Sequence, residues 1–182
     1  PKILSFNIHG SLLPKYRGRT PHVWSIINNE KNSGISAHII DEGCDTGAIL
    51  SQVIIPIGQN DTGNDILSKY KSKYFSLIKD VLDKIESNKL SPLIQDESLA
   101  TYYGIRKPKD GRINWNWHKE RIRNWVRAQA NPYPGAFSFV NGNKLTVDEV
   151  EEVSNGFTSL TENGIVLEIE PNIIVKTPNG VL

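Results

Sequence analysis

Sulfur is scarce in this sequence: its 182 residues include one cysteine, Cys44, and no methionine. One cysteine excludes an internal disulfide framework and is typical of proteins from a reducing compartment, so we expect the cytoplasm. The chain opens on Pro1-Lys2-Ile3-Leu4, which reads as the middle of a strand, and it has no initiator methionine. We therefore expect further sequence upstream of Pro1.

The sequence also has no excess of one charge and no long apolar run. It contains 21 Lys and Arg residues against 20 Asp and Glu residues, so no overall field directs the chain toward nucleic acid or a membrane. No apolar run approaches the roughly 20 residues that cross a bilayer. The composition indicates a globular protein, long enough for one ordinary domain with a small appendage.

Several catalytic signatures are absent as well. The sequence has no GxGxxG or GxxxxGK[ST] loop for phosphate and no HExxH or paired CxxC for a metal. Ser11 and Cys44 do not lie in a known nucleophile signature. His38 and Asp41 are three residues apart, but these metal signatures are absent and the lone Cys44 cannot build a structural zinc site, so we expect no metal.

The first hundred residues alternate strands and helices, as is typical of an α/β domain. Thr20 and Pro21 form a cap and a first-turn proline, and Thr62 with Asp65 is placed like a capping box. The predicted elements are strands over 2–6, 35–40 and 48–57, a short helix from Thr20 to about Asn28, and a long amphipathic helix from Asp61 to about Asn88. The first strand is expected to end at a polar loop that begins at Asn7.

The pattern changes in the second half of the chain. Residues 91–114 carry scattered prolines and glycines and indicate an irregular connection. A helix is predicted over about Lys119–Gln129, ending before Asn131-Pro132 because the residue before proline avoids the helical region. Four strands are then predicted, over 136–140, 144–150, 164–169 and 172–177, separated by Asn-Gly and Pro-Asn turns.

Asn7 and His9 are the first candidates for chemistry. They lie two residues apart directly after the first predicted strand, so both side chains point to one side of an extended backbone. Open α/β sheets bind their ligands at the carboxyl ends of the strands. A histidine in such a place is also commonly a hydrogen-bonded structural residue, so spacing alone leaves both roles open.

A second candidate region is the acidic segment 38–47, where a predicted strand runs into a turn bounded by glycines. Glycine lets the backbone approach a flat ligand closely and lets a carboxylate such as Asp45 turn toward a neighbouring histidine. The alternative is an acidic surface turn. By residue type alone, Asp61 and Asp110 are equally eligible.

A third feature is the basic cluster of Lys15, Arg17 and Arg19, directly ahead of the helix that begins at Thr20. Cationic side chains near a helix N-terminus suit an anion such as a nucleotide diphosphate. A solvated basic loop is the alternative, and the residues alone do not decide between the two.

Longer motifs resemble a known family. They are Asn7-x-His9-x-Ser11-Leu12-Leu13-Pro14 with Tyr16-Arg17-Gly18, then Asp41-x-Gly43-x-Asp45-Thr46-Gly47-x-Ile49-Leu50, Pro108-x-Asp110-Gly111-x-Ile113-x-Trp115, and Arg127-Ala128-x-x-Asn131-Pro132-Tyr133-Pro134-Gly135-Ala136. Together they resemble the signature of the folate-dependent formyltransferases, which include methionyl-tRNA, glycinamide ribonucleotide and sugar N-formyltransferases. The resemblance extends to about residue 150.

The resemblance implies a catalytic trio of Asn7, His9 and Asp45 that acts on an amine and on N10-formyltetrahydrofolate, without a metal. Asn7 and His9 would stabilise the negative oxygen of a tetrahedral intermediate, and His9 with Asp45 would manage the proton that leaves the amine. The pterin ring of the cofactor would border the backbone of four residues, His38, Ile39, Ile40 and Asp41.

The resemblance also implies an α/β fold. Residues 1–100 would be the C-terminal part of a Rossmann-like formyltransferase core whose N-terminal portion precedes this sequence. Residues 101–182 would hold a linker, the short helix and a small β-rich, OB-like region. Family members bind the cofactor largely with the upstream half, so we predict activity for the intact parent protein, which we expect to be a homodimer.

Two features favour a nucleotide-linked amino sugar, carried by UDP or dTDP, over methionyl-tRNA. Residues 148–182 contain one lysine, Lys176, and no arginine, whereas gripping RNA requires phosphate contacts. Tyr133 also stands where the tRNA enzymes often have tryptophan. The predicted substrate contacts are Lys15, Tyr16 and Arg17 for the diphosphate and Arg127, Asn131 and Tyr133 for the sugar or base. A hypothesis of another class is a non-catalytic interaction fragment whose β-rich tail serves dimerisation.

Overall fold

A computed structural model describes residues 4–153 and 160–182 of the chain. The chain divides into two compact units. The first comprises Pro1–Ile26 and Glu30–Arg106, and the second comprises Ile27–Asn29 and Lys107–Leu182. Within the described ranges, no helix combines the length and apolar character that crossing a membrane requires.

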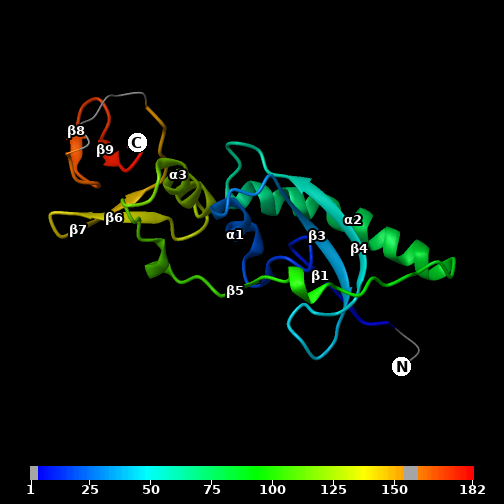
Figure 1. Cartoon of the computed structure of the whole chain (residues 1–182). Coiled ribbons are helices and arrows are strands. Elements are labelled where there is room, and N and C mark those ends of the chain that lie inside the picture. Colours follow the sequence, from blue (N-terminus) through cyan, green and yellow to red (C-terminus); the bar gives the residue numbers. More distant parts are fainter. Residues whose placement is uncertain (1–3, 154–159) are drawn as a thin grey trace. The chain divides into compact units, whose positions relative to one another are not determined.

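The first unit is built on a three-stranded antiparallel sheet of order β1-β3-β4, which makes it a mixed α/β fold (Figure 1). The predicted start of the polar loop at Asn7 is wrong, because Asn7 and His9 pair with His38 and Ser36 of the next strand and therefore lie inside β1. The strands are β1 (Phe6–His9), β3 (Asn32–Ile39) and β4 (Ile49–Pro56).

One face of this sheet is covered by the long helix α2 (Gly63–Glu86), which runs alongside β3 and β4 in Figure 1. The Tyr70 hydroxyl bonds to Ser33 Oγ, and Ser51 Oγ donates to Asp80 Oδ2 at 2.6 Å. The predicted capping box is confirmed: Asp65 N donates to Thr62 Oγ1 at 3.2 Å, and Thr62 N donates to Asp65 Oδ2 at 2.9 Å. These contacts fix α2 against the face that carries Ser33, Ile35 and Ala37.

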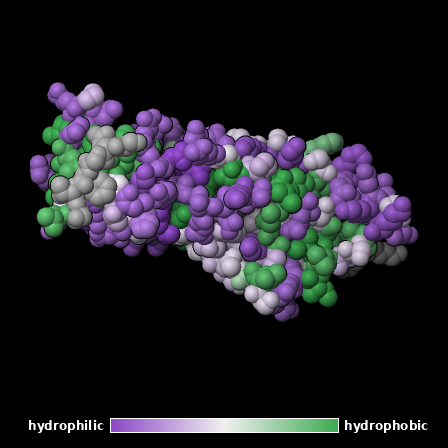
Figure 2. Space-filling view, turned by 45° about the horizontal axis from the view of Figure 1, so that its top comes forward, coloured by the Kyte–Doolittle hydropathy of each residue, from purple (hydrophilic) through white to green (hydrophobic). Residues whose placement is uncertain are grey.

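Helix α2 is apolar on more than its buried side. Leu77 and Val81 are buried, whereas Phe75 is 79% exposed and Ile78 and Ile85 are 37% and 38% exposed. The predicted apolar period therefore includes buried residues such as Leu77 and Val81 but also Ile78 and Ile85, which are exposed. Apolar patches, green in Figure 2, accordingly interrupt a mostly hydrophilic surface.

The opposite face of the sheet is covered by the loop of residues 10–18. A Cβ added at Gly34 would lie 2.5 Å from Val53 O of β4 and 2.4 Å from Leu12 Cδ2, so glycine here lets both the neighbouring strand and the loop approach closely. Ser36 Oγ donates to Ser11 O at 2.6 Å and accepts from Leu13 N at 3.2 Å. Because Asn7 and His9 pair with residues 38 and 36, their side chains lie on this loop-covered face.

The rest of the first unit contains α1 (Pro21–Ile27) apart from its last residue, η1 (Glu97–Leu99) and two short strands. β2 (Arg17–Gly18) pairs in parallel with β5 (Tyr102–Tyr103). The prediction of an irregular connection over 91–114 is confirmed for most of the segment, although η1 and the two-residue β5 lie within it. Tertiary hydrogen bonds, from Arg17 N to Thr101 O at 2.8 Å and from Arg19 N to Tyr103 O at 2.9 Å, order the segment against the basic loop.

The second unit packs one helix with short strands, and its core includes Ile122, Trp125 and Val126. The last three predicted strands are longer than the observed ones. The sequence did not predict β10, which pairs with β9 in a three-stranded sheet of order β10-β9-β8. An OB-like arrangement stays a prediction. The elements are η2 (Pro108–Gly111), α3 (Lys119–Ala128), β6 (Ala136–Val140), β7 (Asn143–Val147), β8 (Val166–Glu168), β9 (Ile174–Thr177) and β10 (Gly180–Val181).

Candidate active site

The loop after β3 carries Asp45 and has a tightly specified shape. Asp45 adopts a left-handed backbone with φ 58°, which a non-glycine residue seldom does. A Cβ at Gly47 would lie 1.8 Å from Ile39 O, so the loop returns to β4 only with glycine there. Asp41 Oδ1 accepts from Thr46 Oγ1 at 2.7 Å and from Gly43 N at 3.1 Å, and the Thr46 hydrogen bond in particular lowers the pKa of Asp41.

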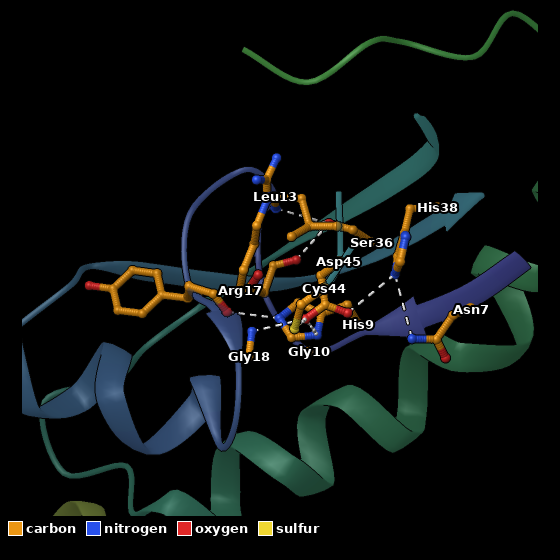
Figure 3. A network of polar contacts seen from close by, with 12 residues as sticks. Asn7, His9, Gly10, Leu13, Arg17, Gly18, Ser36, His38, Cys44 and Asp45 are labelled. Atoms are coloured by element: carbon orange, nitrogen blue, oxygen red, sulfur yellow. Dashed lines mark hydrogen bonds and ion pairs between the residues drawn. The ribbon is translucent and has the colours of Figure 1, made fainter. Parts of the chain in front are cut away.

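This loop brings Asp45 onto the face of the sheet that holds His9 (Figure 3). His9 Nδ1 lies 3.4 Å from Asp45 Oδ2. The same carboxylate oxygen accepts from Gly18 N at 2.9 Å, so the loop of residues 10–18 also holds Asp45 in place. Two residues that are 36 positions apart in the sequence (9 and 45) thus form one polar pair.

The hydrogen bonds of His9 define its tautomer. His9 Nε2 lies 2.8 Å from Tyr16 O, and because a carbonyl only accepts, Nε2 carries the proton. In the neutral ring Nδ1 is then the basic nitrogen, and it faces Asp45. Burial lowers the pKa of His9 below 6.5, while the hydrogen bond to Tyr16 and the charge of Asp45 oppose that shift. The lowered pKa favours the neutral ring, in which the Nδ1 lone pair faces the Asp45 carboxylate.

His38 links the remaining member of the predicted trio to this pair. Its Nδ1 donates to Ile39 O at 3.0 Å, which leaves Nε2 as an acceptor for Asn7 Nδ2 at 3.5 Å. His38 Nε2 also lies 3.6 Å from Asp45 Oδ1. Asn7 and Asp45 thus both lie beside the same nitrogen of His38. Sequence reasoning missed this side-chain role, although the two-residue spacing of Ser36 and His38 on a strand indicates a shared face.

The main chain of the predicted pterin-binding stretch is partly engaged within the sheet. Ile39 N donates to Ala48 O at 2.9 Å, and Ile40 N donates to Ser5 O at 3.1 Å. Ile39 O also accepts from His38 Nδ1 at 3.0 Å, so several main-chain groups of this stretch already have partners within the protein.

The other acidic candidates lie in different surroundings. Asp61 forms an ion pair with Lys69 and accepts from Gly58 N. Asp110 Oδ2 accepts from Lys107 N at 2.7 Å at the start of η2. Of these three carboxylates only Asp45 lies beside His9, and its catalytic role stays a prediction.

The three residues predicted to contact a diphosphate differ in exposure. Lys15 is exposed, whereas Tyr16 is buried, stacks on Tyr103 at 4.9 Å between ring centroids and donates its hydroxyl to Glu30 at 2.7 Å. Arg17 is fully buried, and all five of its N–H donors are used, by Gln95, Glu97 and Tyr102. Arg17 therefore has no donor left for a substrate phosphate.

Three further predicted contacts lie in the second unit. Arg127 is at the end of α3 and donates from Nε to Asn124 Oδ1 at 2.8 Å. Asn131 is exposed and Tyr133 is half-buried, and burial raises the pKa of Tyr133. Their contact with a sugar or base stays a prediction. Across the parts of the chain that the structure describes, no group of three or more His, Cys, Asp and Glu side chains is arranged to hold a metal ion.

Two family models match the chain in succession. The formyl transferase model matches residues 1–82, and the formyl transferase C-terminal domain model matches residues 106–182. The chain is also 39% identical over 176 residues to the bifunctional polymyxin resistance protein ArnA of Wigglesworthia glossinidia brevipalpis, a match that covers 96% of this chain and 26% of that protein.

Solved structures share the fold. An N-formyltransferase from Helicobacter canadensis, in complex with folinic acid and dTDP-3-aminofucose, is 28% identical with a TM-score of 0.72, over 97% of this chain and 63% of that one. A methionyl-tRNA formyltransferase from Clostridium thermocellum is 22% identical with a TM-score of 0.67, over 100% of this chain and 69% of that one, which establishes a common fold only.

The chain thus spans about a quarter of the ArnA relative and less than two thirds of the Helicobacter enzyme. The two family models leave only residues 83–105 between them unmatched, and the predicted trio gathers around one polar cluster. The chain belongs to the formyltransferase family.

Proposed function

We propose that the intact protein transfers a formyl group from N10-formyltetrahydrofolate to the primary amine of a nucleotide-linked amino sugar, carried by dTDP or UDP. The observation that carries this proposal is the 3.4 Å contact between His9 Nδ1 and Asp45 Oδ2. It provides a neutral base beside a carboxylate, which is what deprotonation of an attacking amine requires.

The proton path follows from the tautomer of His9. As the amine attacks the formyl carbon a new C–N bond forms, and the amine must lose a proton. Nδ1 of His9 can accept it because Nε2–H is donated to Tyr16 O. The resulting imidazolium is stabilised by Asp45 and can return the proton to the departing folate nitrogen when its bond to the formyl carbon breaks.

Asn7 is suited to stabilise the negative oxygen that develops during attack. One of its amide N–H groups is directed at His38 Nε2, which orients the amide so that the second N–H is available to an oxyanion. A fixed donor of this kind is effective because it needs no reorganisation during the reaction. The charged His9 ring, formed in the same step, adds to that stabilisation.

The cofactor proposal rests on residues 38–41. A pterin ring presents N–H groups and acceptors that suit main-chain contacts, and the backbone of His38, Ile39, Ile40 and Asp41 would border it. The Helicobacter relative was crystallised with folinic acid, a formylated folate, which supports this class of ligand. When bound, the cofactor supplies the formyl carbon.

The substrate proposal rests on charge and on the same relative, whose structure contains dTDP-3-aminofucose. Lys15 and Arg19 are exposed next to the site and suit a diphosphate. Arg127, Asn131 and Tyr133 of the second unit are proposed to meet the sugar or base.

Methionyl-tRNA is the second candidate substrate. Residues 107–147 contain eight Lys and Arg against two acidic residues, a bias that suits nucleic acid. Residues 148–182 argue against it, because their one basic residue, Lys176, is 3% exposed and cannot reach a phosphate. The acidic residues of that stretch would repel RNA, so the amino sugar is preferred. The homodimer and the cytoplasmic location remain predictions.

The test is turnover by the intact protein supplied with N10-formyltetrahydrofolate and one of three acceptors: a dTDP-amino sugar, a UDP-amino sugar or methionyl-tRNA. Mass spectrometry would identify the formamide product, and release of tetrahydrofolate would give the rate. We expect product with an amino sugar only. Product with methionyl-tRNA alone would replace the proposed substrate, and no product with any acceptor would favour an interaction fragment.

A further inference from the structure

We propose that Gln95 is a positioning residue for formyl transfer: its side chain clamps the loop that carries Asp45, and buried Arg17 holds Gln95 in the orientation this requires. The inference rests on the proposed function, because it assigns Gln95 its effect through the Asp45–His9 pair. Residue 95 lies between the two regions that the family models match.

Gln95 uses both of its donors on one short loop. Its side chain is almost completely buried, and Nε2 donates to Asp45 O at 2.8 Å and to Gly47 O at 2.7 Å. The two carbonyls flank Thr46, so the amide bridges the loop where its backbone is left-handed, at φ 58° for Asp45. A non-glycine residue stays in that conformation only when its surroundings hold it there.

Arg17 determines which way the Gln95 amide points. Gln95 Oε1 accepts from Arg17 Nε at 3.2 Å and from Nη2 at 2.7 Å. A flipped amide would set its N–H groups against a guanidinium that also has only donors. Glu97 secures Arg17 in turn, with Nη2 to Oε1 at 2.7 Å and Nη1 to Oε2 at 2.9 Å. The chain of contacts therefore runs from Glu97 through Arg17 and Gln95 to the Asp45 loop.

The same segment also reaches the carboxylate of Asp45 by a second route. β5 pairs with β2, and Gly18 of β2 donates its N–H to Asp45 Oδ2 at 2.9 Å. A Cβ at Gly18 would lie 2.4 Å from Tyr103 O, so the pairing is close. The segment 95–103 thus contacts the main chain of Asp45 directly, through Gln95. It supports the side chain of Asp45 indirectly, because β5 pairs with the strand that contains Gly18. Loss of the hydrogen bonds from Gln95 would let the Asp45 carboxylate move relative to His9 Nδ1.

The test is steady-state kinetics of the intact protein with Gln95→Met, which keeps the volume of the side chain and removes both N–H donors. We expect kcat to fall about tenfold, in line with a small misplacement of reacting groups, while KM for both substrates changes by less than about twofold. In an Asp45→Asn background the same change should reduce kcat by no more than about twofold, because the residue on which Gln95 acts is already disabled.

Gln95→Asn provides a second variant in case Gln95→Met does not fold. The shorter amide keeps its donors but cannot reach Arg17 and both carbonyls together, so kcat should fall in the same direction by a smaller factor. Gln59→Met makes the same chemical change at an exposed glutamine, in the turn that follows β4 at the end of the sheet away from His38. Ile66→Val weakens the buried core at that end, and both controls should leave kcat unchanged.

The outcomes separate the two proposals. Absence of formyl transfer by the unaltered protein would count against the proposed function. Turnover by the unaltered protein together with unchanged kcat in both Gln95 variants would overturn the clamp. So would a tenfold loss that persists in the Asp45→Asn background, or an equal loss of kcat in Ile66→Val, because either result would show that Gln95 acts through general stability or another group.

Discussion

His9 and His22 are both buried in the first unit, yet their surroundings differ. His22 packs edge-on against the Tyr70 ring, with centroids 6.2 Å apart, and burial lowers its pKa to about 4. Burial also lowers the pKa of His9, but the hydrogen bond to Tyr16 O and the charge of Asp45 oppose the shift. Burial alone therefore does not mark a catalytic histidine. In the case of His9 a carboxylate also lies 3.4 Å from Nδ1, the basic nitrogen, and comparison of the two histidines provides a matched control.

The largest expected effect is a difference in kcat between variants of the two histidines. His9→Gln should reduce kcat for formyl transfer by about 10²–10⁴-fold, because it removes the group that accepts the proton of the amine. His22→Gln should leave kcat within about twofold. Circular dichroism and thermal unfolding would verify that both variants fold. Retention of most of the activity in His9→Gln would remove His9 from the mechanism.

The next effect concerns the pH dependence of stability that arises from His22. The pKa of His22 is about 4 in the folded protein against 6.5 when exposed, so between these values the unfolded chain binds a proton that the folded chain does not. The titration of His22 therefore leaves the free energy of unfolding unchanged above pH 6.5 and lowers it by up to about 3 kcal/mol as the pH falls toward 4.

Urea unfolding of the unaltered protein and of His22→Gln between pH 7 and 4 measures this contribution. The free energy of unfolding should decline less steeply with acid in the variant. Parallel curves for the two proteins would mean that His22 does not stay neutral when buried.

A smaller effect is expected from removing the charge of Asp45, the carboxylate beside His9. Asp45→Asn should lower kcat about 10- to 100-fold, since a hydrogen bond to a charged group contributes about 1.5–3 kcal/mol. Asp61→Asn is the matched control, because Asp61 pairs with Lys69 at the other end of the sheet. Equal losses in the two variants would show that general electrostatics, and not the His9 contact, controls the rate.

The smallest effect is the pH dependence of the unaltered enzyme. The reaction needs neutral His9, whose pKa lies below 6.5. The value of kcat/KM should therefore be level near pH 7 and fall about tenfold per pH unit below the pKa of His9. A pH–rate profile measured with the amino sugar tests this, and a rate that rises on acidification would contradict a role for His9 as the base.

The sequence predicts much of this site because its motifs are local. The glycine-bounded turn of Asp45 and the capping box of α2 each depend on residues close together in the chain. The first strand was predicted over 2–6, whereas the observed β1 extends through Asn7 to His9. The choice of Asp45 came from the family resemblance, since Asp61 and Asp110 were equally eligible by type.

Contacts between distant segments could not be predicted in the same way. Arg17 was expected to contact a substrate phosphate, whereas Gln95, 78 residues away, and Glu97 occupy its guanidinium. Residues 91–114 lack a regular period, so their pairing with β2 depends on tertiary hydrogen bonds that no spacing reveals. The side-chain role of His38 was missed because it requires the register between β1 and β3.

The protonation state of His9 tests the central claim most directly. Nitrogen-15 NMR of the intact protein with labelled histidine, assigned by comparison with His9→Gln, would report both ring nitrogens across pH. At pH 7.5 we predict a neutral ring with its proton on Nε2, and protonation of Nδ1 at a pH below 6.5 that coincides with the fall in kcat/KM. A neutral ring with its proton on Nδ1 would contradict the account, because no basic nitrogen would then face Asp45.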